Sequence, residues 1–301
     1  MEMHQLRYLV ALARTGNFSR AAELCHVSQP ALSQQIQKLE DELGERLFNR
    51  MKREAKLTPP GEALLHRAIR ILDEVAAATR EAKDATELLR GKVTIGALPT
   101  IAPYLLPKIL VKFMEKFPGV EIVVHEDTTA HLLNLLLACE IDFALVSQPV
   151  RDSRLEVREL FAEELLLALP PGHPLARKRT VRASDLENER LIVMKDGHCL
   201  GEQVLNFCER RDVQPNIGFR SAQLETIQSL VCAGMGLSLI PAMAAKAGHV
   251  GRPEYRSIQS PKPERKIVVT WPKQHPPGRE TVEFLKMLYV LVGNTVGEKL
   301  G

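Results

Sequence analysis

Apolar residues recur at helical spacing at the start of the chain, at Leu6, Leu9, Val10 and Ala13. This spacing predicts a first helix that ends at Gly16 and Asn17. We expect a second, short helix over residues 20–24 with Ser19 as its N-cap, then a turn over residues 25–28. The helical period restarts in a third segment, whose apolar positions are Ala31, Leu32, Ile36, Leu39 and Leu43. Two helices joined by a tight turn suit a helix-turn-helix.

The third helix carries polar side chains on its other face, and basic residues follow it. Amides and hydroxyls can donate and accept hydrogen bonds at base edges, while Lys and Arg contact phosphates. Ser28 suits the N-cap of this helix and Pro30 its first turn. The expected DNA-binding residues are Ser28, Gln29, Pro30, Ser33, Gln34, Gln37, Arg50, Lys52 and Arg53. A small helical bundle with a solvated basic loop is the alternative, and the pattern alone leaves both open.

No Gly or Pro interrupts residues 62–90, so a long helix is expected there. Its apolar and small residues step alternately by three and four: Leu65, Ala68, Leu72, Val75, Thr79, Ala82, Thr86 and Leu89. Such a seam favours a dimerising linker helix, which would let two DNA readers span two half-sites. A solvated single helix remains the alternative because the Thr positions are weak.

Strand-like and helix-like segments alternate after residue 91, which predicts parallel α/β units. The expected strands cover 92–98, 120–127 and 143–148, and the helices between them cover 103–119 and 128–142. Thr100 and Thr129 follow two of these strands, where α/β folds bind ligands, and each is also a plausible helix cap. Further strands are expected over 164–169, 190–194, 216–221 and 265–272, with a final helix over 281–292.

Composition limits the classes that remain. A chain of 301 residues suggests two or three domains, and 45% hydrophobic with 26% charged residues is ordinary for a folded protein. The net charge of +3 is too small to indicate nucleic-acid binding, which therefore depends on the local pattern. The first residues do not resemble a signal peptide, and no long apolar run is present. Five irregularly spaced cysteines favour a cytoplasmic protein in which a disulfide would be transient.

The segment "DGHCLGEQVLNFC" places Cys199 and Cys208 at the two ends of an expected helix over 200–208. Metal binding and papain-like catalysis are poorly supported, because the partner ligands and the local signature are absent. A buried, inert Cys208 is the ordinary interpretation. Cys199 differs, since a helix N-terminus and the adjacent His198 would favour its thiolate, which attacks peroxide.

The helix separates the two sulfurs. Nine residues at about 1.5 Å per residue span about 13.5 Å, whereas a disulfide requires Cα atoms within roughly 7 Å. If the segment is helical, joining the two cysteines must refold it, which would couple oxidation to a conformational change.

Two motifs carry a resemblance to a known family. "FSRAAELCHVSQPALSQQIQKLEDELGERLFNR" followed by "LTPPGEALL" resembles the DNA-binding domain of LysR-type transcriptional regulators, with Pro60 as a departure from the usual small residue. The resemblance implies an all-α winged helix-turn-helix DNA-binding domain (1–58), a long dimerising linker helix (59–90) and an α/β two-lobed periplasmic-binding-protein-like regulatory domain (91–301). Lobe I would cover 91–161 and 265–301, and lobe II 162–264.

The cysteine pair further resembles the peroxide-sensing members of this family. By that resemblance Cys199 is the peroxidatic thiol and Cys208 the resolving one. His198, Thr100 and Thr129 would position peroxide, and Arg265 would stabilise the thiolate. The implied partners are double-stranded DNA, hydrogen peroxide, further copies of the chain as a dimer of dimers, RNA polymerase and a thiol reductant.

Two other hypotheses stay open. One is a regulator that binds a small organic inducer between the lobes, with both cysteines structural; the other is a thiol peroxidase that uses His198 and Cys199. We expect a non-enzymatic protein without cofactor or metal. The remaining cysteines are expected in the core: Cys25, Cys139 and Cys232.

Overall fold

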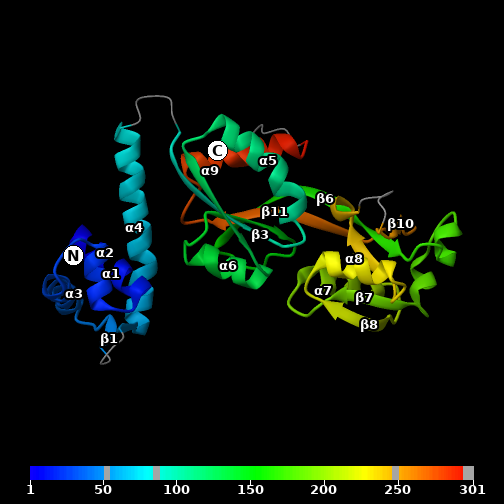
Figure 1. Cartoon of the computed structure of the whole chain (residues 1–301), viewed down its shortest axis with the longest axis horizontal. Helices are drawn as coiled ribbons and strands as arrows, with labels where there is room; N and C mark the ends of the chain where they lie inside the picture. Colours follow the sequence, from blue (N-terminus) through cyan, green and yellow to red (C-terminus); the bar gives the residue numbers. More distant parts are fainter. Residues whose placement is uncertain (51–54, 84–88, 246–250, 294–301) are drawn as a thin grey trace. The chain divides into compact units, whose positions relative to one another are not determined.

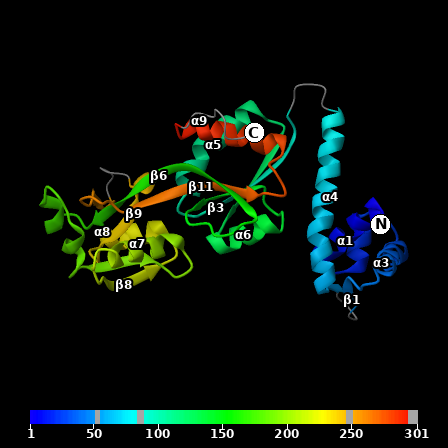
Figure 2. The same cartoon turned by 180° about the vertical axis from the view of Figure 1, so that it is seen from behind.

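The computed structural model describes residues 1–50, 55–83, 89–245 and 251–293. The chain divides into two compact units, Met1–Leu88 and Leu89–Gly301. Figures 1 and 2 show both units from opposite sides.

The first unit is a winged helix-turn-helix, as the motifs predict. Helices α1 (Met3–Thr15), α2 (Phe18–Leu24) and α3 (Gln29–Leu43) surround a core of buried residues that includes Leu9, Leu32 and Ile36. Strands β1 (Phe48–Arg50) and β2 (Ala55–Leu57) pair antiparallel and form the wing.

The caps of these helices agree only in part with the prediction. Ser28 caps α3, and its Oγ accepts a hydrogen bond from the Ala31 amide. The cap of α2 is Asn17 and not Ser19, because the Asn17 side-chain oxygen Oδ1 accepts hydrogen bonds from the amides of Ser19 and Arg20. Gly16 adopts a left-handed conformation and ends α1 at Thr15. Asn17 is therefore extended, which is the conformation of an N-cap.

The long helix α4 (Pro59–Lys83) follows Thr58, whose Oγ1 accepts a hydrogen bond from the Gly61 amide at 3.1 Å. Some residues of the predicted dimer seam pack instead within the first unit. Ala68 is completely buried in the core of the first unit, and Leu72 packs against that core, whereas Val75 is 42% exposed. Leu65 is half-buried, and the side chains of Thr79 and Ala82 lie outside the described part of α4.

The second unit contains a seven-stranded sheet. Its strands follow the order β10-β6-β11-β5-β3-β4, and β9 also pairs with β6. Their bounds are β3 (Gly91–Ala97), β4 (Val120–Glu126), β5 (Phe143–Ser147), β6 (Leu155–Leu169), β9 (Ser238–Pro241), β10 (Glu254–Arg256) and β11 (Glu264–Pro272). The expected parallel units are present, because β3 pairs parallel with both β4 and β5.

Three helices cover the parallel strands. Figures 1 and 2 show α5 (Ala102–Lys116) and α9 (Arg279–Leu291) side by side on one face and α6 (Thr129–Leu137) on the other. The helix expected over 128–142 ends five residues early. Cys139 adopts a left-handed φ of 56°, which a continuing α-helix does not permit.

The rest of the unit surrounds a second core. Parallel strands β7 (Arg190–Met194) and β8 (Asn216–Ser221) lie with α7 (Cys199–Glu209) and α8 (Leu224–Cys232). Three short 3-10 helices complete it: η1 (Pro174–Arg177), η2 (Ala183–Leu186) and η3 (Ala242–Ala244). The two hydrophobic clusters meet along β6, which contributes Leu160 to the first and Leu165 to the second. The regulatory domain is therefore two-lobed, as expected.

Candidate functional site

The start of α3 presents the polar face that is expected to read DNA. Ser33 is half-buried, and the other residues predicted there are exposed: Ser28, Gln29, Pro30, Gln34 and Gln37. The apolar residues Leu32 and Ile36 point the other way and are fully buried. Three predicted phosphate contacts, the Arg50 side chain, Lys52 and Arg53, lie outside the described part of the chain.

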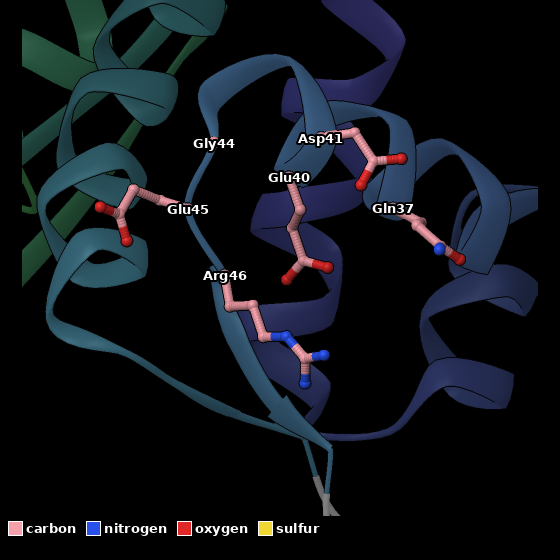
Figure 3. A pocket seen from close by; sticks show the side chains of 6 residues that line it. All are labelled: Gln37, Glu40, Asp41, Gly44, Glu45 and Arg46. Carbon is pink, nitrogen blue, oxygen red and sulfur yellow. The ribbon is translucent and has the colours of Figure 1, made fainter.

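A buried carboxylate anchors the wing to α3, which the sequence analysis did not foresee. Glu40 is 8% exposed, and its Oε1 accepts hydrogen bonds from the amides of Leu47 (2.8 Å) and Phe48 (3.2 Å). The pocket beside it is lined by Gln37, Glu40, Asp41, Gly44, Glu45 and Arg46 (Figure 3). Its three carboxylates disfavour the binding of phosphate in this pocket.

The two cysteines of interest stand at opposite ends of one continuous helix. Cys199 is the first residue of α7, His198 is its N-cap, and Cys208 is fully buried in the second core. Both are free thiols. The helical rise separates their Cα atoms by about 13.5 Å, so the pair cannot be bonded while α7 is intact.

Close packing fixes the start of α7. Gly197 turns the chain with a φ of 88°, in the left-handed region that favours glycine. A Cβ on Gly201 would lie 2.6 Å from the Met194 carbonyl oxygen, so glycine lets the helix approach the end of β7. The residues between β7 and α7 therefore hold Cys199 in a defined place.

Arg265 is the hub of a buried polar network. Its side chain is completely inaccessible, and its Nη1 and Nη2 donate to Thr100 Oγ1 (2.9 Å) and the Thr100 carbonyl oxygen (3.0 Å). Glu163, its cross-strand neighbour on β6, pairs with it at 2.8 Å. The other Glu163 oxygen accepts the Met243 amide of η3 at 2.9 Å. The structure thus brings Thr100 and Arg265 together.

Glu163 was missed by the sequence analysis. The available signal was the pair Glu163 and Glu164 directly before the apolar run "LLLALP", because a charge at a buried strand needs a partner.

Thr129 is the first residue of α6, next to Cys199. Among the described residues, its Oγ1 is buried and meets no group with normal hydrogen-bond geometry, although its interaction with the thiol is close enough to lower the pKa of Cys199. The neighbouring Thr128 is the N-cap, so Thr129 is not needed as a cap. A buried hydroxyl beside the Cys199 thiol suits the binding of a small polar ligand.

Burial decides the protonation of the site. It raises the pKa of the Cys199 thiol, and the Thr129 hydroxyl and the Arg265 charge oppose that rise only in part. Burial, with Lys195 nearby, lowers the pKa of His198 and favours the neutral imidazole. The expectation of a lowered thiol pKa in the resting protein is therefore wrong, because desolvation of the thiolate outweighs the stabilising partners. A neutral His198 can accept a proton.

The other cysteines differ from the prediction of core residues. Cys25, Cys139 and Cys232 are all only half-buried, and the Cys232 thiol donates to the Gly251 carbonyl oxygen at 3.3 Å. Each lies near the end of a helix, where packing is incomplete.

Within the described ranges, no three or more His, Cys, Asp or Glu side chains come together as metal ligands. No described helix is long and apolar enough to cross a membrane.

Two families match the chain. Residues 3–62 match the bacterial regulatory helix-turn-helix proteins of the lysR family, and residues 86–289 match the LysR substrate binding domain. The Escherichia coli K12 protein named DNA-binding transcriptional dual regulator OxyR is 40% identical over 245 residues, which are 81% of this chain and 80% of that protein.

Two solved structures agree. A full-length OxyR variant from Pseudomonas aeruginosa has a TM-score of 0.79 and 31% identity, and the match covers 96% of this chain and 98% of that one. A hydrogen-peroxide-bound cysteine variant of Corynebacterium glutamicum OxyR has a TM-score of 0.63 and 30% identity, with 100% and 98% covered. The chain belongs to the LysR family of transcriptional regulators, and within it the chain is similar to the OxyR proteins.

Proposed function

We propose that this protein is a DNA-binding transcriptional regulator, mainly an activator of oxidative-stress genes, that senses hydrogen peroxide through Cys199 and Cys208. The observation that carries the proposal is the pair of free thiols at the two ends of α7. The Cys199 thiol lies beside the buried Thr129 hydroxyl, and the positive charge of Arg265 lowers its pKa. The names of the OxyR relatives support it.

The proposed chemistry has two steps. In the first, the Cys199 sulfur gives up its proton and attacks one peroxide oxygen; the O–O bond breaks, the leaving oxygen takes a proton, and a sulfenic acid and one water result. In the second, the Cys208 sulfur attacks the Cys199 sulfur, the S–O bond breaks and a second water leaves. Two thiols thus supply the two electrons that reduce one peroxide.

The side chains around Cys199 suit the first step. Thr100 and Thr129 would position the peroxide, and the neutral His198 can accept a proton. Arg265 is held at its Thr100 partner and lowers the pKa of the thiol, so its charge favours the thiolate as it forms. One oxidation per protein molecule is a signal, and we therefore propose no enzymatic turnover.

The second step gives the output. Because α7 holds the Cα atoms of the two cysteines about 13.5 Å apart, closing the disulfide requires α7 to unwind. The refolded segment would alter the regulatory domain and, through a dimer of dimers joined by α4, the spacing of the DNA readers. RNA polymerase and a thiol reductant are the further proposed partners. A promoter-binding protein acts at the bacterial chromosome, which supports a cytoplasmic location.

Peptide mapping of the peroxide-treated full-length protein tests the proposal. We expect a Cys199–Cys208 crosslink, and in Cys208→Ser a trappable Cys199 sulfenic acid without the crosslink. Cys232→Ser, a matched half-buried cysteine variant, is expected to respond like the parent in mapping, footprinting and transcription. If peroxide treatment leaves both thiols unreacted, or leaves the footprint and the transcript level unchanged, the result would instead favour a small organic inducer bound between the lobes.

A further inference from the structure

Gln203 joins the helix between the two cysteines to the sheet of the first lobe. It lies one helical turn after Cys199, and its Nε2 donates to Ser147 Oγ at 2.7 Å and to the Gln148 carbonyl oxygen at 3.0 Å. Ser147 is the last residue of β5 and is 1% exposed. The acceptors are therefore the last residue of β5 and the residue that follows it, both outside α7.

The direction of these hydrogen bonds is fixed by the surroundings. Ser147 Oγ donates its own proton to the Lys266 carbonyl oxygen at 3.3 Å, so it must accept from Gln203. The Gln148 carbonyl oxygen is an acceptor only. Gln203 Oε1 is buried and has no partner within the described residues, so the two Nε2 bonds are the side chain's polar contacts there.

We propose that Gln203 is a clamp that keeps α7 helical in the thiol form and so sets the rate of the disulfide-forming step. This rests on the proposed function. The chain between the cysteines cannot unwind while Gln203 stays bonded to the end of β5. Peroxide reaction at Cys199 needs no unwinding, so the clamp acts after the sulfenic acid has formed.

Gln203→Met tests the clamp, because Met keeps the length and helix propensity of the side chain and removes the hydrogen bonds. The control is Asn206→Met, which introduces the same side chain at an exposed position of the same helix. Loss of two hydrogen bonds predicts crosslink formation roughly 5- to 100-fold faster than in the parent. Ser147→Ala should give a smaller acceleration, and combining it with Gln203→Met should add nothing.

Rapid-quench alkylation with mass spectrometry, after a saturating peroxide pulse to the full-length protein, separates the two steps. We expect the loss of the Cys199 thiol to keep its rate within about twofold while the crosslink forms faster. An unchanged crosslink rate overturns the clamp. So does slower thiol loss with an unchanged second step, because Gln203 would then serve the peroxide.

Hydrogen exchange of the reduced protein tests the clamp without peroxide. The α7 amides should exchange roughly 5- to 100-fold faster in Gln203→Met than in the parent or in Asn206→Met. Equal exchange overturns the clamp. A parent protein that forms no Cys199–Cys208 crosslink refutes the proposed function, and the exchange result still decides whether Gln203 restrains α7.

Discussion

Removing the charge of Glu163 should destabilise the regulatory domain far more than removing a neighbouring charge on the same strand. Glu163→Gln keeps the shape of the side chain and leaves the Arg265 guanidinium buried without a counter-ion. The control is Glu159→Gln, whose carboxylate pairs with Lys266 at 3.0 Å at the surface.

The exposures of the two pairs give the magnitudes. The Arg265 and Glu163 side chains are 0% and 7% exposed, and loss of one partner from such a buried pair costs roughly 3–5 kcal/mol. The Lys266 and Glu159 side chains are 53% and 46% exposed, and a surface pair contributes about 0–1 kcal/mol. Glutamine also places an NH2 donor where Glu163 has one of its two oxygens, so either Arg265 or the Met243 amide would face a donor, which adds to the first value.

The chain offers a local probe for this measurement. Trp271 is the single tryptophan, it is 6% exposed, and it lies on β11 with Arg265. Its fluorescence during urea denaturation therefore reports unfolding of the regulatory domain and not of the DNA-binding domain. We expect the midpoint to fall strongly in Glu163→Gln and little in Glu159→Gln, with similar slopes.

Equal midpoints for the two variants would refute the reasoning. The buried pair of Arg265 and Glu163 would then contribute no more to stability than the surface pair of Lys266 and Glu159. The double variant Glu163→Leu, Arg265→Met checks the same cause from the other side. It should be more stable than Glu163→Gln, because no unpaired charge remains.

Three further results are expected. Thr129→Val should raise the pKa of the Cys199 thiol further, since the hydroxyl lowers it, and the pH profile of alkylation should move upward; an unmoved profile would contradict this. His198→Gln should lose less stability on acidification. The folded state holds the pKa of His198 below its usual 6.5, so protonation favours the unfolded chain as the pH falls below that value, and equal acid sensitivity of variant and parent would argue against it. Glu40→Ala should weaken operator binding and cost roughly 1–3 kcal/mol, because two wing amides lose their acceptor; intact footprinting would disprove the anchor.

Local patterns predicted the elements well. The helix over 200–208 appears as α7, and the strands around 95, 122 and 145 are present, because helical and strand periodicity act over a few residues. Errors arose where one residue's conformation or packing decided the outcome. Asn17 and not Ser19 caps α2. Ala68, which was predicted on the dimer seam, is buried in the core of its own unit.

The site was less predictable because it depends on contacts far apart in the sequence. Arg265 meets Glu163 across 102 positions and Thr100 across 165. Thr100 was indicated by its place after a strand and by a family resemblance, and Arg265 by the resemblance alone, whereas Glu163 and Gln203 had no such guide. Burial of the Cys199 thiol is likewise a property of the folded domain, so the helix N-terminus suggested the wrong direction for its pKa.

The buried face of α7 determines how far the proposed oxidation would reach. Leu200, Val204 and Cys208 share that face and are at most 3% exposed. Burial of one Leu or Val side chain stabilises a fold by about 1.5–3 kcal/mol, so α7 cannot unwind at this face without loss unless these side chains find new cover. A disulfide between its ends would therefore have to repack the second lobe and could not remain a local change at the sulfurs. The helix α7, which keeps the thiols apart, is thus also the element that would transmit disulfide formation to the rest of the second lobe.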